Sequence, residues 1–450
     1  MPTALIVLAA GQGTRMQSEL PKVLHKIGGA PLFSHALDAA AALDAEKTIL
    51  VVGHGSDTVT AAAHDLNPDI DIVLQTEQLG TGHAVAQAKD AMKDFQGDVV
   101  VLYGDTPFVQ PDSLHRMIAA HKTHDVVVLG FETPDPARYG RLVMAGETLQ
   151  RIVEYKDATE AERQINYCNS GIMVASASTM FDLLGSIDTN NASGELYLTD
   201  LVEVANAKGM TATAVTCDEA ETLGVNSRAD LAAAEAHFQK RARQKALDNG
   251  VTLIAPDTVY FSTDTLLGRD VTVEPNVVFG QGVSVETGAV IRSFSHLEGC
   301  HVGAGSLVGP YARLRPGAEL ANETHIGNFV EIKNSQIGEG TKVNHLSYIG
   351  DADLGDKTNI GAGTITCNYD GVNKHRTEIG SGVSIGSNTM LIAPVAVGDN
   401  AMTASATVVT KNVPDGAFAI TRPELVIKPG FGRKLLEKFK AIKAAKQKDA

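Results

Sequence analysis

The stretch VGAGSLVGPYARLRPGAELANETHIGNFVEI, residues 302–332, carries an aliphatic residue at every sixth position. A six-residue period fits neither an α-helix nor a simple hairpin, and it is typical of a parallel β-helix. In such a fold three hexads make one triangular coil, and the aliphatic side chains stack inside it. The stretch therefore predicts a prism of β-coils, whose inward positions are Val302, Val308, Leu314, Leu320, Ile326 and Ile332.

The same period extends through most of the second half of the chain. It continues after a one-residue slip at Ile337 and after a second slip at Leu354. Residues 367–378, CNYDGVNKHRTE, break the period, so we expect a loop that protrudes from the prism. With ~4.8 Å between coils, about nine coils would give a prism on the order of 40 Å long. We therefore predict an all-β domain at 250–450, which ends in a lysine-rich, solvated and frayed tail.

The first half of the chain has a different pattern. Six apolar, β-rich runs, among them residues 3–10 and 98–104, alternate with helical stretches up to about residue 226. This alternation predicts an α/β domain at 1–226, Rossmann-like, with a mostly parallel sheet. Ligands on such sheets bind beyond the carboxyl ends of the strands. The loops after the runs LIVLAA and VVVLYG are therefore the first places to look for a site.

Residues 227–249 predict a helical linker between the two domains. Ser227 can cap the helix, Asp230 favours its first turn, and Gly250 can end it. The stretch is rich in alanine and charged residues, and its apolar residues are sparse. We expect one continuous helix.

Composition excludes several classes of function. The chain has 450 residues, with 38 Lys and Arg against 53 Asp and Glu, and a net charge of −15. A nucleic-acid backbone is bound by clustered basic residues, so no nucleic acid is expected as a partner. The first apolar run is too short for a signal peptide or a membrane span, and no membrane insertion is expected. The four cysteines form no CxxC pair, which favours reduced thiols and a cytoplasmic protein.

The first loop, in LIVLAAGQGTRM at residues 5–16, matches neither of the two best-known phosphate-binding motifs. Gly11 and Gly13 have no third glycine behind them, so the dinucleotide fingerprint GxGxxG is incomplete, and the GK[ST] of a P-loop is missing. What remains is a strand that enters a turn whose backbone N–H groups can point at an anion, with Arg15 and Lys22 to add positive charge. A tight turn without a ligand is the alternative on this stretch alone.

Several motifs together resemble one family of enzymes. They are LAAGQGTRM followed by PKVLH, LQTEQLGTGHA, VLYGDTP, VEYKD, NSGI, GELYLTD and LGVNSR, joined to the hexad repeats. The chain resembles the sugar-1-phosphate nucleotidyltransferases. Over nearly its whole length it is similar to the bacterial family that combines N-acetylglucosamine-1-phosphate uridylyltransferase and glucosamine-1-phosphate N-acetyltransferase activities. The resemblance implies a left-handed β-helix, a homotrimer and a cytoplasmic enzyme that supplies UDP-N-acetylglucosamine for peptidoglycan and lipopolysaccharide.

The resemblance implies that the α/β domain transfers uridylyl from UTP to N-acetylglucosamine-1-phosphate. In-line attack on the α-phosphate needs charge neutralisation and positioning rather than a nucleophilic side chain. By similarity, Asp105 and Asn226 hold Mg²⁺, and Gln75 reads uracil with an amide that offers a donor and an acceptor. The residues implied to bind UTP or UDP-N-acetylglucosamine are Leu8, Ala9, Ala10, Gly11, Arg15, Lys22, Gln75, Gly80, Thr81, Tyr103, Gly104, Asp105, Gly140, Glu154, Asn169 and Asn226.

The resemblance implies that the β-helix transfers acetyl from acetyl-CoA to glucosamine-1-phosphate. The attacking amine needs a base, and His345 is the expected catalytic residue because a neutral imidazole can accept a proton near neutral pH. Glu331 is expected to orient this imidazole. The aminosugar phosphate is expected at Arg315, Lys333, Tyr348 and Asn359, with Asn368 and Tyr369 of the loop close by; acetyl-CoA is expected at Ala362, Asn368, Tyr369, Ser387, Ser405 and Arg422.

Two positions depart from the family pattern. Gln12 stands where lysine is common, which removes one phosphate contact. Ser405 stands where alanine is usual, and because the backbone would make that contact, binding is expected to survive.

Two rival functions stay open on the sequence. One is a nucleotidyltransferase with a single activity whose β-helix only regulates it, as in ADP-glucose-forming relatives. The other is a β-helix that serves only assembly. His345 together with Asn368 and Tyr369 argues against the first. Metal binding by His325 and His345 is a poor alternative, because no nearby cysteine completes a site.

Overall fold

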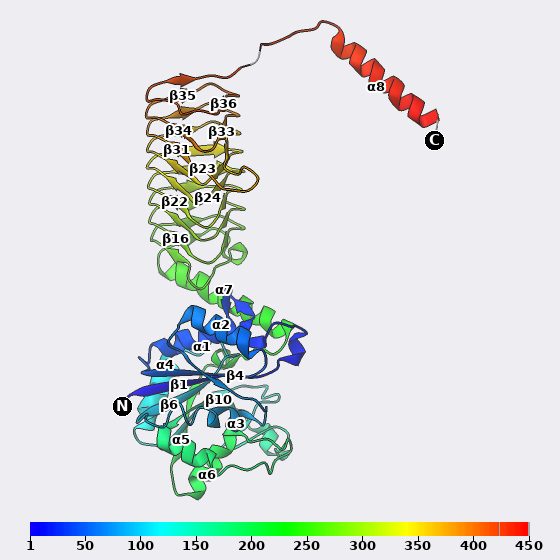
Figure 1. The fold of residues 1–450 in the computed structure, drawn as a ribbon. Coiled ribbons are helices and arrows are strands. Elements are labelled where there is room, and N and C mark those ends of the chain that lie inside the picture. Colours follow the sequence, from blue (N-terminus) through cyan, green and yellow to red (C-terminus); the bar gives the residue numbers. More distant parts are fainter. Residues whose placement is uncertain (423, 449–450) are drawn as a thin grey trace. The chain divides into compact units, whose positions relative to one another are not determined.

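The structure, a computed structural model, describes residues 1–422 and 424–448. The chain divides into two compact units (Figure 1). Unit 1 comprises Met1–Lys245 with Phe261–Thr263, and unit 2 comprises Ala246–Tyr260 with Asp264–Ala450. Each unit has its own buried aliphatic core, so each is described by itself.

Unit 1 is built on the α/β sheet that the sequence predicts. Its strands lie in the order β11-β7-β10-β6-β1-β4-β5, and β10 runs antiparallel to both of its neighbours while the other pairs on this path are parallel. A hairpin of β8 and β9 lies beside β10. The strands are β1 Thr3–Ala9, β4 Lys47–Val52, β5 Asp71–Leu74, β6 Asp98–Tyr103, β7 Val126–Glu132, β8 Arg141–Ala145, β9 Thr148–Val153, β10 Tyr167–Ser176 and β11 Ala212–Cys217, with a separate ribbon of β2 Lys26–Ile27 and β3 Ala30–Pro31.

The unbroken apolar run of β1 reflects burial of the sheet on both faces. Alternate side chains of a strand point to opposite faces. Accordingly, Ile6 belongs to one core of unit 1, and Leu5 and Val7 belong to another. Helices supply the other half of each core, as expected for strands of this kind. They are α1 Leu32–Ala41, α2 Ser56–Leu66, α3 Thr81–Ala86, α4 Pro111–His121, α5 Ala177–Leu184 and α6 Leu201–Ala207.

The predicted helical linker is α7, Arg228–Asp248. Oγ of Ser227 accepts a hydrogen bond of 3.2 Å from the backbone N–H of Asp230, whose carboxylate accepts one of 2.9 Å from the N–H of Ser227. This reciprocal cap satisfies N–H groups that the first helical turn leaves without partners. Further along, Ala234 and Phe238 pack on a small core of unit 1 that includes Met16.

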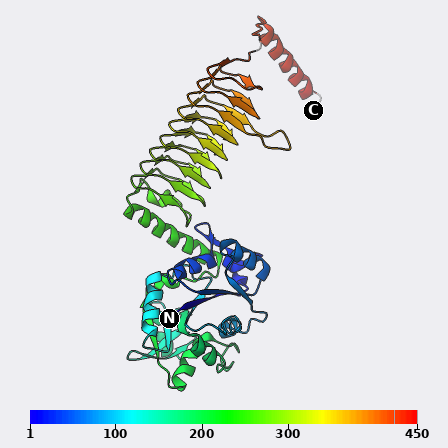
Figure 2. The ribbon, with the colours of Figure 1, turned by 60° about the vertical axis from the view of Figure 1, so that its left-hand side comes forward.

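Unit 2 is a parallel β-helix, as predicted. Its stacked coils form three sheets, and the strands within each sheet run parallel (Figure 2). The hexad spacing sets the pairing, because Val308 pairs with Ile326, three hexads further on. The predicted one-residue slip shortens the next coil, where Ile326 pairs with Val343. The three aliphatic side chains are at most 1% exposed, so they form the inside of the prism.

Each sheet of the β-helix is made of short strands from successive coils. Sheet I contains β12 Thr252–Leu253, β14 Thr272–Val273, β17 Val290–Ile291, β20 Leu307–Val308, β23 His325–Asn328, β26 Lys342–His345, β29 Asn359–Ile360, β32 Ser384–Ile385, β35 Met402–Thr403 and β37 Phe418–Ala419. Sheet II contains β13 Leu266–Leu267, β16 Val283–Val285, β19 Cys300–Val302, β22 Ala318–Leu320, β25 Ser335–Ile337, β28 Ala352–Leu354, β31 Thr377–Ile379 and β34 Val395–Val397. Sheet III contains β15 Val278–Phe279, β18 His296–Leu297, β21 Arg313–Leu314, β24 Glu331–Lys333, β27 Tyr348–Gly350, β30 Ile365–Cys367, β33 Met390–Ile392 and β36 Val408–Val409.

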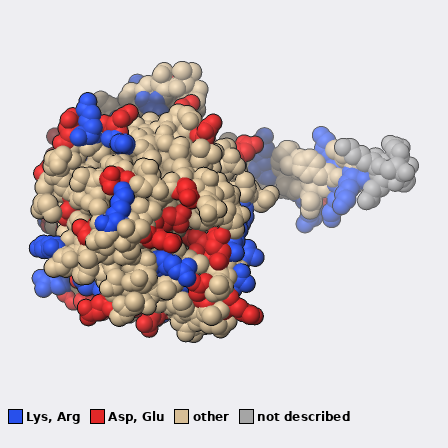
Figure 3. All heavy atoms as spheres, turned by 90° about the horizontal axis from the view of Figure 1, so that it is seen from below, with Lys and Arg blue, Asp and Glu red and all other residues tan. Residues whose placement is uncertain are grey.

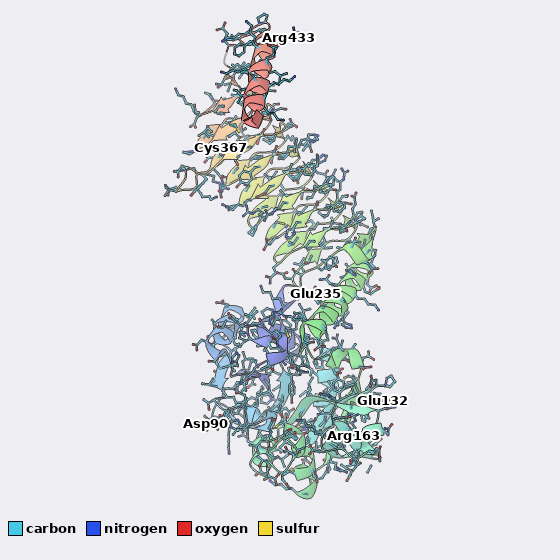
Figure 4. All side chains as sticks on the ribbon, turned by 90° about the vertical axis from the view of Figure 1, so that its right-hand side faces the viewer. Asp90, Glu132, Arg163, Glu235, Cys367 and Arg433 are labelled. Carbon is cyan, nitrogen blue, oxygen red and sulfur yellow. The ribbon has the colours of Figure 1, made fainter. Side chains whose placement is uncertain are left out.

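Two features lie outside the stacked coils. The predicted loop leaves the coils after Cys367, at the end of β30, and returns at β31 (Figure 4). The lysine-rich end was expected to be frayed, and this is wrong for the described residues, which form the helix α8, Phe431–Lys448. The physical reason is that Leu435, Phe439 and Ile442 recur at helical spacing. Residues 449–450, which belong to the same tail, lie outside the described residues.

Two expectations drawn from the composition concern the distribution of surface charge and the length and hydropathy of the helices. On the face of unit 1 that Figure 3 shows, acidic and basic side chains are interspersed rather than gathered into a basic area. Within the described residues, none of the helices is both long and apolar enough to cross a membrane.

Candidate active sites

A cleft of about 250 Å³ lies in unit 1 at the carboxyl ends of β1 and β6. The α/β topology places ligands at this edge of the sheet. Val23, Gln78, Ala84 and Glu195 line the cleft without having been predicted, because nothing in their spacing sets them apart. Most of the residues expected to bind the nucleotide also line it, namely Leu8, Ala9, Ala10, Gly11, Lys22, Gln75, Gly80, Thr81, Tyr103 and Asp105.

Two side-chain oxygens, from Asp105 and Asn226, accept from the ammonium of Lys22 at this cleft. Nζ of Lys22 forms an ion pair with Oδ2 of Asp105 and donates a hydrogen bond of 3.1 Å to Oδ1 of Asn226. Asp105 follows β6, and Asn226 is held just before α7 by a hydrogen bond of 3.0 Å from its N–H to the Asp230 carboxylate. The Lys22 and Asp105 side chains are 12% and 20% exposed, so little water screens their charges. The fold thus brings together the two residues that the resemblance assigns to the metal.

Two half-buried polar groups, Tyr103 and Glu154, lie on the side of the cleft expected to hold the sugar. Burial raises the pKa of Tyr103 well above its usual value, and the carboxylates of Glu154 and Asp105 raise it further, against a hydrogen bond with Thr81. Burial also raises the pKa of Glu154, against a hydrogen bond of 3.4 Å from Thr199. Tyr103 therefore keeps its proton and can donate a hydrogen bond to a sugar hydroxyl, whereas the oxygens of Glu154 can accept one.

Gly140 and Asn169 lie beside Glu154. The backbone N–H of Asn169 donates a hydrogen bond of 2.8 Å to the carbonyl of Gly140. A Cβ atom at Gly140 would stand 3.3 Å from Oε1 of Glu154, so glycine leaves the carboxyl group its room. Gly104 is close to the nucleotide cleft, because its N–H donates to the carbonyl of Leu8 at 2.9 Å.

Arg15 differs from the other predicted residues of unit 1. It lies in a short 3₁₀ turn, Thr14–Met16, where its side chain is exposed and is not part of the cleft lining. Gln12, the first departure from the family pattern, is exposed on the same loop.

In unit 2 the expected acetyl-transfer residues form a column along the β-helix. The strands β26, β29, β32 and β35 of sheet I pair in this order. Their registers place His345, Ala362, Ser387 and Ser405 at the same corner of four successive coils. Because successive coils are ~4.8 Å apart, the column offers an extended ligand a ladder of backbone groups that begins at the imidazole.

The cations expected to hold the sugar phosphate lie on the outer face of sheet III, which follows that corner. Ile332 points inward and is buried, so its neighbour Lys333 points outward. Tyr348 pairs with Glu331 on the next rung. Arg315 donates a hydrogen bond of 2.8 Å to Oε1 of Glu331, which keeps its guanidinium on the same face.

The imidazole of His345 has a different partner from the one expected. Its Nδ1 lies 3.1 Å from Oδ1 of Asn328, one coil earlier in the same column. Glu331, the expected partner, is paired with Arg315. Asn328 therefore orients the ring within the chain, and the expectation for Glu331 is wrong here, because neighbouring coils place residues of the same corner in contact.

A buried carboxylate ties the protruding loop to sheet III. Asn368 is 5% exposed, and its amide donates to Asp351 and, at 3.4 Å, to the hydroxyl of Tyr348. Burial alone would raise the pKa of Asp351, but hydrogen bonds from Asn334 and Asn368 and the nearby Lys333 lower it below its usual value. Asp351 is thus a charged anchor that sequence reasoning missed.

Three of the predicted residues lie apart from this arrangement within one chain. Asn359 is on sheet I, Tyr369 is 58% exposed on the loop, and Arg422 follows the last strand and is exposed. A hollow of about 160 Å³ beside His345, on the sheet I side, is lined by Asn328 among other residues. None of these three residues lines that hollow, and His345 is exposed, so the expected acetyl-transfer site is open to solvent within one chain.

Comparison with known proteins identifies the family of the chain. A family model for MobA-like NTP transferase domains matches residues 5–167. The bifunctional protein GlmU of Ruegeria sp. (strain TM1040) is 64% identical over 448 residues, which cover 100% of this chain and 100% of that protein. The bifunctional protein GlmU of Jannaschia sp. (strain CCS1) is 58% identical over 448 residues, 100% of this chain and 99% of that protein.

The chain belongs to the GlmU family of bifunctional proteins. Membership confirms the prediction of a transferase with nucleotidyltransferase and acetyltransferase activities in UDP-N-acetylglucosamine synthesis. Among solved structures, a UDP-glucose pyrophosphorylase in complex with UDP-glucose covers 54% of this chain and 100% of its own, with a TM-score of 0.45 and 18% identity.

Proposed function

We propose that unit 2 first acetylates glucosamine-1-phosphate and that unit 1 then transfers uridylyl from UTP to the product. The observation that supports two reactions on one chain is the pair of separate sites; their order follows from the chemistry, because the acetylated sugar is the substrate of the second reaction. A nucleotide-sized cleft with a half-buried cation lies in unit 1, and a column headed by His345 lies in unit 2. The two rival functions, each with one activity, leave one of these sites without a use.

In the acetyl transfer, the sugar amine attacks the thioester carbonyl of acetyl-CoA. A nitrogen–carbon bond forms and the carbon–sulfur bond breaks, so coenzyme A leaves as a thiolate. His345 takes the proton released by the amine and passes it to the thiolate, while Asn328 holds the ring in position. Arg315 and Lys333, on the adjoining face, hold the sugar phosphate.

In the uridylyl transfer, a phosphate oxygen of N-acetylglucosamine-1-phosphate attacks the α-phosphorus of UTP, and pyrophosphate leaves. The chain contributes position and charge rather than a nucleophile. The turn after β1 faces the triphosphate, Lys22 neutralises it, and Gln75 faces uracil. Tyr103, whose pKa is raised by burial, donates a hydrogen bond to the sugar, and the side-chain oxygens of Glu154 accept one.

Asp105 and Asn226 fit a magnesium ion. Their oxygens already converge on the ammonium of Lys22, so the site attracts a cation. Mg²⁺ needs only one or two protein oxygens and takes phosphates and waters as its other ligands. Bound there, the ion would neutralise the phosphates, and Lys22 would be released to contact them.

A homotrimer would complete the open acetyl-transfer site. A row of large apolar side chains, which we call the corner ridge, runs beside the His345 column, and its members Phe294, Tyr311, Phe329 and Leu346 are 51%, 47%, 56% and 62% exposed. The rings of Phe294 and Tyr311 stack at 4.9 Å, and those of Tyr311 and Phe329 at 5.2 Å. Exposed apolar rows of this kind mark protein contacts, and a second copy of the chain is the occupant that we propose.

The cytoplasm is the proposed location. The four cysteines are all unpaired, as expected for a reducing compartment. The substrates UTP, acetyl-CoA and glucosamine-1-phosphate are small molecules, and neither a nucleic acid nor a membrane is part of the proposal.

One assay tests the two reactions together. The full chain is supplied with glucosamine-1-phosphate, acetyl-CoA, UTP and Mg²⁺, and free coenzyme A and UDP-N-acetylglucosamine are followed over time. Coenzyme A should appear before the UDP-sugar, and omission of acetyl-CoA should abolish both. Formation of UDP-glucosamine at a comparable rate without acetyl-CoA would contradict the proposed order.

A further inference from the structure

Gln75 is fixed in the cleft by two hydrogen bonds from the same amide nitrogen. The residue is 4% exposed, and its Nε2 lies 3.2 Å from the carbonyl of Gly80 and 3.0 Å from Nδ1 of His83. An amide nitrogen has two N–H groups, so these contacts use both of them. Within the part of the chain that the structure describes, Oε1 of Gln75 is left as the amide atom available to a ligand.

His83 has contacts on both ring nitrogens. Its Nδ1 faces Gln75, and its Nε2 lies 3.0 Å from the amide of Gln87. A neutral imidazole carries one N–H and one acceptor, so only one of the two amides can donate to it.

Burial decides which amide donates. If the buried Gln75 turned over, its oxygen would meet the carbonyl of Gly80, and two acceptors would face each other away from water. The amide of Gln87 also donates to the backbone carbonyl of His83 at 3.1 Å, but Gln87 is only half-buried, so water can take over that contact when the amide turns and presents its oxygen to the ring. Nδ1 of His83 is therefore the acceptor, and the proton lies on Nε2.

We propose that His83 is a positioning residue that selects uracil over cytosine by locking the amide of Gln75 with its oxygen toward the base. This inference rests on the proposed role of Gln75 in unit 1. It adds a residue that the sequence motif LQTEQLGTGHA contains but that had been given no role.

The chemistry of the two bases explains the selection. Uracil carries a donor at N3, whereas the N3 atom of cytosine is an acceptor. An amide oxygen that cannot turn over accepts from the first and repels the second. Without the acceptor on His83, only the Gly80 carbonyl still opposes the turned-over amide of Gln75, so the orientation that presents its NH₂ group becomes more populated and the cleft tolerates cytosine better. A site built around one hydrogen bond rejects the wrong partner only while its own group is held in place.

The test is the ratio of kcat/KM with UTP to kcat/KM with CTP for the full chain carrying His83→Leu. We expect this ratio to fall about tenfold or more, through better use of CTP and poorer use of UTP. His83→Asn should restore most of the ratio, because the asparagine Oδ1 can stand near the position of Nδ1. The ratio does not depend on the amount of folded enzyme, so a loss of stability cannot imitate the effect.

A matched control is His64→Leu. His64 also lies on a helix of unit 1 and contacts a backbone carbonyl, that of Ile70 at 3.2 Å, but it does not line the cleft. Its ratio should stay at that of the unaltered chain. An unchanged ratio in His83→Leu, or no recovery in His83→Asn after a fall, overturns the inference.

Gln75→Leu separates this inference from the proposed function. If Gln75 faces uracil, this variant raises KM for UTP and lowers the ratio whatever His83 does. If Gln75→Leu leaves both unchanged, the proposed uracil site is wrong and the inference falls with it. If Gln75→Leu has its effect and His83→Leu has none, only the role of His83 is wrong.

Discussion

The nucleotide cleft of unit 1 and the acetyl-transfer column of unit 2 present their polar groups in different ways. In unit 1, Asp105 and Asn226 both contact the ammonium of Lys22, and the surrounding residues form a cleft. In unit 2, His345 is exposed at a corner, and the cations lie on an outer face. A sheet with loops at one edge can enclose a ligand, whereas a prism with a packed interior can offer only its outside.

The difference implies that the two sites need different numbers of chains. A cleft inside one domain can bind its ligand as soon as that domain is folded. A column on an outer face excludes water only when another surface covers it, and the corner ridge beside His345 is the apolar surface that invites such cover. The predictions below test whether the first site is complete in one chain and the second is not.

The largest effect is expected for His345→Ala. Loss of the general base should lower acetyl transfer by ~10²–10⁴-fold. Uridylyl transfer to supplied N-acetylglucosamine-1-phosphate should not change, because that cleft lies in unit 1. The two specific activities are measured side by side, with His301→Ala, on sheet II, as the matched control. A folded variant that acetylates at the normal rate would leave the column without its base.

For Asp105→Asn we expect a slightly smaller effect, and on the other reaction. The replacement keeps the shape of the side chain but removes the charge that holds a cation, so uridylyl transfer should fall by about 10²–10³-fold. Acetyl transfer should be nearly untouched. Asp71→Asn is the control, because Asp71 also pairs with a lysine, Lys47 at 2.9 Å, but lies outside the cleft. UDP-sugar formation at the normal rate would show that Asp105 is not the metal ligand.

The smallest effect concerns the stability of unit 1. Burial, with Glu203, Asp188, Glu154 and Asp157 nearby, raises the pKa of Asp200 to about 6. In the unfolded chain the carboxyl group ionises near its usual pKa, so folding becomes less favourable as pH rises from about 4 to about 6 and stays so above.

Asp200→Asn should therefore stabilise unit 1 at pH 7.5 by about 1 kcal/mol after allowance for solvent screening, and should have no such effect at pH 4. Thermal unfolding at the two pH values measures the difference. An equal change at both pH values would mean that ionisation is not the cause.

The sequence predicted those parts of the molecule that depend on local periodicity. The hexad spacing predicted the coils of unit 2. The one-residue slip between Ile332 and Ile337 appears in the structure as a shortened coil. The apolar run at 3–10 gave β1, because a strand buried on both faces is apolar throughout. The hairpin β8–β9 was missed, since its strands are half-exposed and carry no strict alternation.

Local periodicity could not predict the contacts between residues that are far apart in the sequence. The meeting of Lys22 with Asp105 and Asn226 could be expected from the resemblance alone, because nothing local joins the start of η2 (Lys22–Leu24) to the end of β6 or the start of α7. Asn328 beside His345 follows from coil register, which the hexads do contain, but only when the slip is placed correctly. Coil register also predicts the corner ridge, because its members occupy the same corner of successive coils.

The central claim is that acetyl transfer needs a second chain and uridylyl transfer does not. Phe329→Asp places a charge in the middle of the corner ridge, at an exposed position whose φ of 56° suits aspartate better than phenylalanine. Leu266→Asp, at a residue 67% exposed on sheet II, is the matched control.

The deciding measurement is the molecular mass by light scattering at assay concentration, taken together with both specific activities. For Phe329→Asp we predict a mass of one chain, normal uridylyl transfer and acetyl transfer lowered by about tenfold or more, since proximity and exclusion of water are lost. The control should keep the mass of three chains and both activities. A one-chain variant with full acetyl-transfer activity would contradict the account.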